Sequence, residues 1–71
     1  MKNTIKVERA RHNLSQQELA DKLGITRQSV CAIEAGRFTP STLQALKMAK
    51  LFDIPVDALF MLDVDEMINI H

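Results

Sequence analysis

The chain has 71 residues, in which 9 Lys and Arg balance 9 Asp and Glu, and 46% of the residues are hydrophobic. A chain of this length forms a single domain, because a second domain would need a core of its own. It has little volume for a deep catalytic cleft, so we expect no enzyme, no cofactor and no metal. The lone Cys31 excludes an internal disulfide framework and indicates a reducing, cytoplasmic environment.

The longest apolar run covers residues 58–62 and is far too short to span a bilayer, which takes about 20 residues. Residues 1–7 alternate charged and apolar side chains, which is unlike a signal peptide. We therefore expect a soluble protein that is not exported.

Charge is distributed unevenly along the chain. Residues 1–50 contain every Lys and Arg and have a net charge of +5, whereas residues 51–71 have a net charge of −5. This asymmetry predicts a basic face built by the first two-thirds of the chain and an acidic terminal segment directed elsewhere.

The first predicted elements precede residue 14. Residues 1–4 are a candidate strand that would pair with residues 61–64 near the other end of the chain. A helix is predicted from about Thr4 to His12. Asn13 follows it, and Asn tolerates the left-handed conformation that often ends a helix.

A second helix is predicted from Gln16. The sequence from Ser15 to Glu18 is a capping box, in which the Ser hydroxyl and the Glu carboxylate each accept a backbone N–H. The apolar stripe of this helix contains Leu19, Ala20 and Leu23, and Gly24 is placed to stop it.

A third helix is predicted from Arg27 to about Ala35, capped by Thr26 and stopped by Gly36. Val30 and Ile33 would face the core. With these two inward, steps of 100° per residue place Gln28, Ala32 and Ala35 farthest outward, with Arg27 and Cys31 on the flank.

The fourth helix is predicted from Thr42 to Phe52, because Ser41 to Gln44 reads as a second capping box and Asp53 can end the helix. Its predicted inward face is Leu43, Leu46, Ala49 (or the aliphatic stem of Lys50) and Phe52. Pro55 suits the first turn of a short fifth helix that ends at Phe60 or Met61. Residues 64–71 have a scattered apolar pattern, which is as consistent with a frayed tail as with an ordered segment.

The second and third helices, joined by the tight turn at residues 24–26, have the spacing of a helix-turn-helix. In that motif the first helix braces the second, and the second enters the major groove of DNA. The segment resembles the Cro/repressor type of helix-turn-helix found in small Xre-like regulators. The matching residues are Leu14–Ala20, Leu23–Val30, Ala32–Arg37 and Pro40–Ser41, within a resemblance that covers Ile5–Phe60.

This resemblance implies an all-α, five-helix, lambda-repressor-like domain that binds DNA sequence-specifically as a homodimer on a palindromic operator. It implies that Gln16 contacts a phosphate with its side chain and its backbone amide, that Gln28 reads a base, and that Arg27 reaches a base or the backbone. Gln can bind adenine N6 and N7 through two hydrogen bonds, whereas Ala32 is long enough only to touch a thymine methyl. The positions implied near the DNA backbone are Thr26, Ser29, Arg37 and Thr39. Arg9 and Glu34 match a structural ion pair between the first and third helices.

Apolar residues after Asp53 exceed what so small a core can hide, and such an excess is typical of a partner surface. We expect a domain core at residues 4–61 and a tail or dimerisation segment at residues 62–71. The dimerisation candidates are Leu59, Phe60, Met61, Leu62, Val64 and Met67.

The sequence thus predicts a cytoplasmic, homodimeric transcriptional regulator, and we expect a repressor. The alternative hypothesis is an antitoxin or other protein-interaction module that binds its own operator together with an unidentified protein partner. An enzyme is disfavoured, because Ser15, Ser29 and Ser41 occupy caps or a helix face and no phosphate-binding Gly loop is present. The interpretation of Cys31 as a small residue tolerated at this position is favoured over a redox role. His12 and His71 are interpreted as surface residues.

Overall fold

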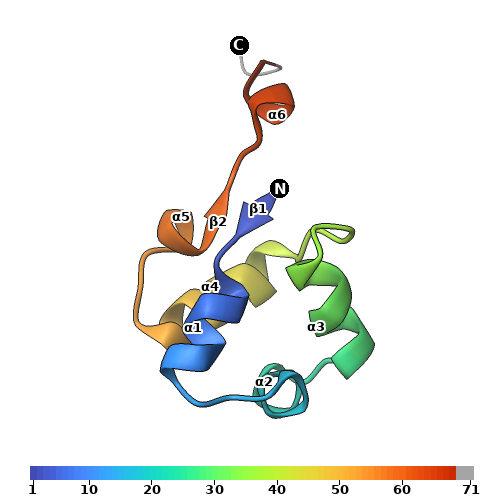
Figure 1. Ribbon diagram of the computed structural model, residues 1–71, viewed down its shortest axis with the longest axis vertical. Helices are drawn as coiled ribbons and strands as arrows, with labels where there is room; N and C mark the ends of the chain where they lie inside the picture. The colour runs from blue at the N-terminus through green and yellow to red at the C-terminus, as the bar shows by residue number, and fades with distance from the viewer. Residues whose placement is uncertain (69–71) are drawn as a thin grey trace.

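The computed structural model describes residues 1–68, which form six helices and one two-stranded sheet (Figure 1). The elements in chain order are β1 (Lys2–Asn3), α1 (Ile5–Arg11), α2 (Gln16–Leu23), α3 (Arg27–Glu34), α4 (Thr42–Phe52), α5 (Val56–Leu59), β2 (Phe60–Met61) and α6 (Val64–Ile68). The helix-turn-helix is α2 and α3, as the sequence predicts.

The local signals at the helix ends act as expected. Ser15 Oγ accepts the backbone N–H of Glu18 at 3.0 Å, and the Glu18 carboxylate accepts the N–H of Ser15 at 2.9 Å. The backbone N–H of Ser15, and after it the Ser15 hydroxyl, stabilise the Glu18 carboxylate and hold its pKa below the usual value. Asn13 and Asp53 adopt left-handed φ angles of 55° and 56°, and Gly24 ends α2 with a φ of 71°. The capping box therefore fixes where α2 begins, and the left-handed residues fix where α1, α2 and α4 end.

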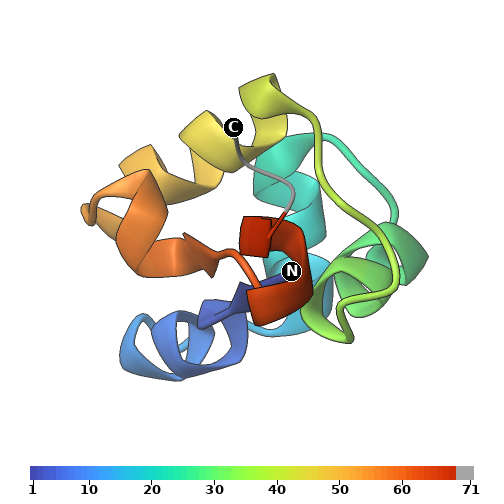
Figure 2. The same ribbon diagram turned by 90° about the horizontal axis from the view of Figure 1, so that it is seen from above.

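The hydrophobic core is formed by side chains from α1 to α5. Seen from above, these five helices surround it (Figure 2). Because α2 and α3 contribute side chains to the same core, their relative angle is set by packing. The buried hydrophobic residues are Ile5, Leu19, Ala20, Leu23, Val30, Ile33, Met48, Ala49, Phe52 and Leu59.

A terminal strand pair is present as predicted, but its second strand is Phe60–Met61 and not residues 61–64, because the chain leaves the sheet after Met61. β1 and β2 are antiparallel, with Lys2 opposite Met61 and Asn3 opposite Phe60. Thr4 extends this link, because its N–H donates to the Leu59 carbonyl at 3.0 Å and its hydroxyl to the Ala58 carbonyl at 3.1 Å. The two ends of the domain are thereby joined next to α1.

The predicted inward face of α4 is wrong at two positions. Leu43 is 61% exposed and Leu46 is 53% exposed, whereas Met48 is buried. The inner stripe is Met48, Ala49 and Phe52, and Leu43 lies on the opposite side of the helix from it. The second capping box is only half formed: Ser41 Oγ accepts the N–H of Gln44, while Gln44 Oε1 is buried without a hydrogen-bond partner.

The C-terminal region also differs from the prediction. Pro55 is the N-cap of α5 and not its first helical residue, and α5 ends at Leu59 because the next two residues join the sheet. The fold has a sixth helix, α6, where the sequence suggested a tail. An extended segment after β2 carries α6 to one end of the longest axis (Figure 1). Ile70 and His71 lie outside the described residues, and within residues 1–68 no helix is both long and apolar enough to cross a membrane.

Candidate nucleic-acid interface

The turn between α2 and α3 is held by local hydrogen bonds and by the core. Thr26 caps α3 by accepting the N–H of Ser29 at 3.1 Å, and the N–H of Ile25 donates to the Ala20 carbonyl at 3.0 Å. Val30 and Ile33 are buried, which fixes the face of α3 that points inward. The opposite face is consequently presented to solvent on a rigid support.

The outward face of α3 begins at its N-terminus. Arg27, Gln28 and Cys31 are exposed and, with Gln16, line a shallow hollow of about 150 Å³. Ala35 is also exposed, in agreement with its predicted direction. Ala32 is only half-exposed, so the prediction that it lies among the outermost residues is corrected. The exposed side chains of α3 are therefore Arg27 and Gln28 at its leading end and Cys31 one turn further along.

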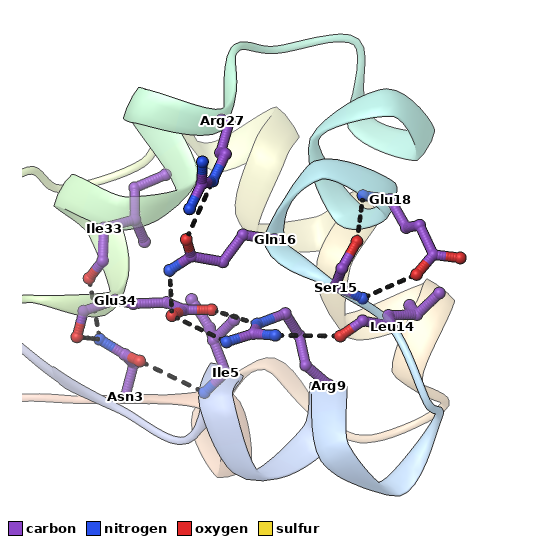
Figure 3. A network of polar contacts seen from close by, with 10 residues as sticks. All are labelled: Asn3, Ile5, Arg9, Leu14, Ser15, Gln16, Glu18, Arg27, Ile33 and Glu34. Carbon is purple, nitrogen blue, oxygen red and sulfur yellow. Dashed lines mark hydrogen bonds and ion pairs between the residues drawn. The ribbon is translucent and has the colours of Figure 1, made fainter.

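An ion pair connects α1 to the end of α3 (Figure 3). Arg9 Nε donates to Glu34 Oε2 at 2.5 Å, Arg9 Nη2 donates to Oε1 at 3.3 Å, and Nη1 donates to the Leu14 carbonyl at 2.9 Å. The Glu34 side chain is only 9% exposed. Because the positive charge of Arg9 compensates the Glu34 carboxylate, this carboxylate adds little negative potential to the face that carries Arg27.

The side chain of Gln16 takes part in the same network. Gln16 Nε2 donates to Glu34 Oε1 at 3.0 Å, and Gln16 Oε1 accepts from Arg27 Nε at 3.4 Å (Figure 3). The sequence resemblance implied only a phosphate contact for this residue. Its bonds to α3 were missed because they join residues 18 and 11 positions apart, which no local pattern reveals.

Asn3 is a further structural residue that the sequence did not single out. Its Nδ2 donates to the carbonyls of Ile33 at 2.9 Å and Glu34 at 3.4 Å, and its Oδ1 accepts the N–H of Ile5 at 3.2 Å. The last carbonyls of a helix lack partners within the helix. Asn3 satisfies two of them and so ties the end of α3 to β1.

The remaining candidate DNA contacts are distributed around α3. The hydroxyls of Thr26 and Ser29 lie 3.0 Å apart at its N-terminus. Arg37 and Thr39 are exposed in the loop after it. The structure therefore brings Gln16, Thr26, Arg27, Gln28 and Ser29 together at the leading end, with Arg37 and Thr39 beyond the trailing end.

The predicted dimerisation residues divide into two groups. Leu59 is 0% exposed and belongs to the hydrophobic core of the domain, so it is not available to a partner and the prediction is corrected there. Phe60 is half-buried and packs against the same core. The exposed apolar side chains of the arm formed by residues 61–68 are Met61, Leu62, Val64, Met67 and Ile68.

Ionic contacts hold the base of this arm. The α-amino group of Met1 lies 3.1 Å from Asp63 Oδ2 and 3.4 Å from Glu66 Oε1, and these carboxylates raise the pKa of the amine. The backbone N–H of Asp63 donates to Glu66 Oε1 at 2.7 Å. The arm is thus linked to β1 by charge as well as by strand pairing. Among the residues that the structure describes, no cluster of His, Cys, Asp and Glu could hold a metal ion.

Residues 5–59 match the family model HTH_3, described as helix-turn-helix. The fold and the exposed α3 thus define a helix-turn-helix protein. The chain is 47% identical over 66 residues to an HTH-type transcriptional regulator of Methanocaldococcus jannaschii, covering 93% of this chain and 100% of the relative. It is 46% identical over 63 residues to the HTH-type transcriptional regulator YgzD of Bacillus subtilis, covering 89% of this chain and 96% of YgzD.

Two solved structures are also similar. The restriction-modification controller protein C.AhdI from Aeromonas hydrophila matches with a TM-score of 0.69 and 34% identity, over 79% of this chain and 81% of C.AhdI. The hypothetical transcription factor NHTF from Neisseria matches with a TM-score of 0.72 and 28% identity, over 90% of this chain and 71% of NHTF. This chain belongs to the Xre-like, Cro/repressor-type helix-turn-helix family and is a DNA-binding transcriptional regulator.

Proposed function

We propose that the protein is a sequence-specific repressor that binds a palindromic operator as a homodimer, with α3 in the major groove. The observation that carries this proposal is the exposure of Arg27 and Gln28 at the leading end of a helix braced by α2. The major groove admits one helix, and residues near the N-terminus of a recognition helix contact base edges.

The proposed base contacts are few. The Gln28 amide can pair with adenine N6 and N7, which is worth about 1 to 3 kcal/mol against a wrong base. Arg27 can donate to guanine O6 and N7 or to a phosphate, and half-exposed Ala32 can touch a thymine methyl. The backbone N–H of Gln16, at the start of α2, and the side chains of Thr26, Ser29, Arg37 and Thr39 are proposed to contact phosphates.

Dimerisation is proposed because one protomer presents a small footprint and also exposes apolar side chains on the arm at residues 61–68. A two-fold interface is built from the same surface on both protomers. In a dimer of this kind the two recognition helices reach half-sites about 34 Å apart, one turn of the duplex. We propose residues 4–61 as the DNA-binding core and the segment from residue 62 onward as part of the interface.

The dimer proposal predicts that Leu62→Asp converts the dimer to monomers, because a charge would be placed in an apolar contact. Leu43→Asp is the matched control: it introduces the same change at an exposed Leu on α4, away from the arm. Sedimentation equilibrium of both variants and the parent measures the effect. Dissociation by Leu43→Asp with an intact Leu62→Asp dimer would place the interface on α4 and contradict the proposal.

A second prediction concerns Arg37. Arg37→Ala should weaken binding to every duplex by a similar factor and reduce the slope of log K against log salt by about one unit, because one phosphate contact is lost. Titrations of a mixed-sequence duplex at several salt concentrations measure this slope. An unchanged slope would remove Arg37 from the interface.

Repression and DNA binding without a partner are tested together. The chain alone is titrated against a duplex selected from a random pool, and that duplex is then placed across a promoter in a purified transcription reaction. We expect specific binding and a lower transcript yield from the occluded promoter. A raised yield would indicate an activator, and loss of all duplex binding without a partner would favour a protein-interaction module.

A further inference from the structure

The network around Glu34 does more than join α1 to α3. From the buried end outward, Arg9 holds the Glu34 carboxylate, Glu34 accepts from the Gln16 amide nitrogen, and the Gln16 amide oxygen accepts from Arg27 Nε (Figure 3). The network begins at a side chain that is 15% exposed and ends at an exposed guanidinium on the recognition helix.

The chemistry of the two neighbours fixes the orientation of the Gln16 amide. An ionised carboxylate only accepts hydrogen bonds and a guanidinium only donates them. With Nε2 toward Glu34 and Oε1 toward Arg27, both bonds are made. The opposite orientation would set oxygen against oxygen and N–H against N–H. The two neighbours therefore favour one orientation of the Gln16 amide in the DNA-free protein.

That orientation determines which edge of Arg27 remains available. A guanidinium has five N–H donors, and the bond from Nε to Gln16 uses the one nearest the side-chain stem. Within residues 1–68 the two terminal nitrogens have no hydrogen-bond partner, and they form a planar fork that matches guanine O6 and N7 or the oxygens of a phosphate. A fork that is already oriented loses less conformational entropy when it binds.

We infer that Gln16 is a positioning residue for Arg27: through Glu34 it holds the guanidinium with its terminal fork directed toward DNA. This inference rests on the proposed contact between Arg27 and DNA. It differs from a phosphate contact by the Gln16 side chain, because the amide acts through another residue. The backbone N–H of Gln16 is unaffected and keeps its proposed phosphate role.

A double-mutant cycle tests the inference, using the full chain and the duplex that the parent selects. Gln16→Met keeps the side-chain length and removes the amide. It should weaken binding about fivefold, the equivalent of one net hydrogen bond. With Arg27→Ala already present, the same change should weaken binding by less than about twofold, because there is no guanidinium left to position.

Gln17→Met is the matched control, since the exposed Gln17 amide donates to Asp21 Oδ1 on the same helix at 2.9 Å, and it should leave affinity unchanged. Hydrogen exchange of the Arg27 Nε–H in the DNA-free protein gives an independent readout and should quicken in Gln16→Met. If Gln16→Met costs the same factor with and without Arg27, the positioning role is overturned while the DNA contact of Arg27 survives. If Arg27→Ala has no effect on affinity, both fail.

Discussion

Replacing Arg9 with Ala is expected to lower the free energy of unfolding by about 3 kcal/mol, because removing one partner leaves the other charge buried and uncompensated. The Glu34 carboxylate would keep only the Gln16 amide among its side-chain partners described here. The Leu14 carbonyl would also lose its donor at the end of the connection between α1 and α2. Domains have a total stability of about 5 to 15 kcal/mol, so this change removes a large share of it.

Urea denaturation of the parent and the variant measures this loss. Lys6→Ala is the control, because Lys6 is an exposed residue of the same helix, for which a change of less than about 1 kcal/mol is expected. Equal effects of the two substitutions would show that the ion pair between Arg9 and Glu34 contributes no more than an exposed charge on the same helix. The double variant Arg9→Met with Glu34→Leu should regain part of the lost stability, since no charge is then left unpaired.

Leu19→Ala is expected to destabilise the fold by about 3 kcal/mol, through lost burial and the cavity left behind. Leu19 is fully buried on α2 and lies in the core cluster with Val30 and Ile33 of α3. A cavity at this site loosens the support of the recognition helix, so affinity for duplex DNA should fall as well.

Thermal unfolding and duplex titration of the same variant measure both effects. Leu46→Ala provides the comparison, because Leu46 is largely exposed and its truncation should cost well under 1 kcal/mol. A stable Leu19→Ala protein that binds DNA like the parent would show that packing between α2 and α3 does not position the recognition helix.

The ends of the helices could be predicted from the sequence because their causes are local. Ser15 and Glu18 form hydrogen bonds with each other within one turn. Gly24 adopts the left-handed conformation that ends α2 without a steric penalty, because it has no side chain. The helix-turn-helix follows from these signals together with the buried stripe of α2. The orientation of Gln28 could be predicted because two inward residues, Val30 and Ile33, fix the rotation of α3.

Contacts between distant segments were not predictable in the same way. The bonds of Asn3 to the end of α3 and of Gln16 to Glu34 depend on how the helices are packed. The face of α4 was misassigned because its leucines suggest an inward stripe, whereas the side chains that fill the core are Met48, Ala49 and Phe52. The burial of Leu59 follows from strand pairing at the next residue, which ends α5 early.

The measurement that tests the central claim most directly is selection of bound duplexes from a random pool by the parent and by Gln28→Ala in parallel. The account predicts that the parent selects two symmetric half-sites and that Gln28→Ala loses the base preference at one position of each half-site. Identical selected sequences for the two proteins would contradict base reading by the leading end of α3.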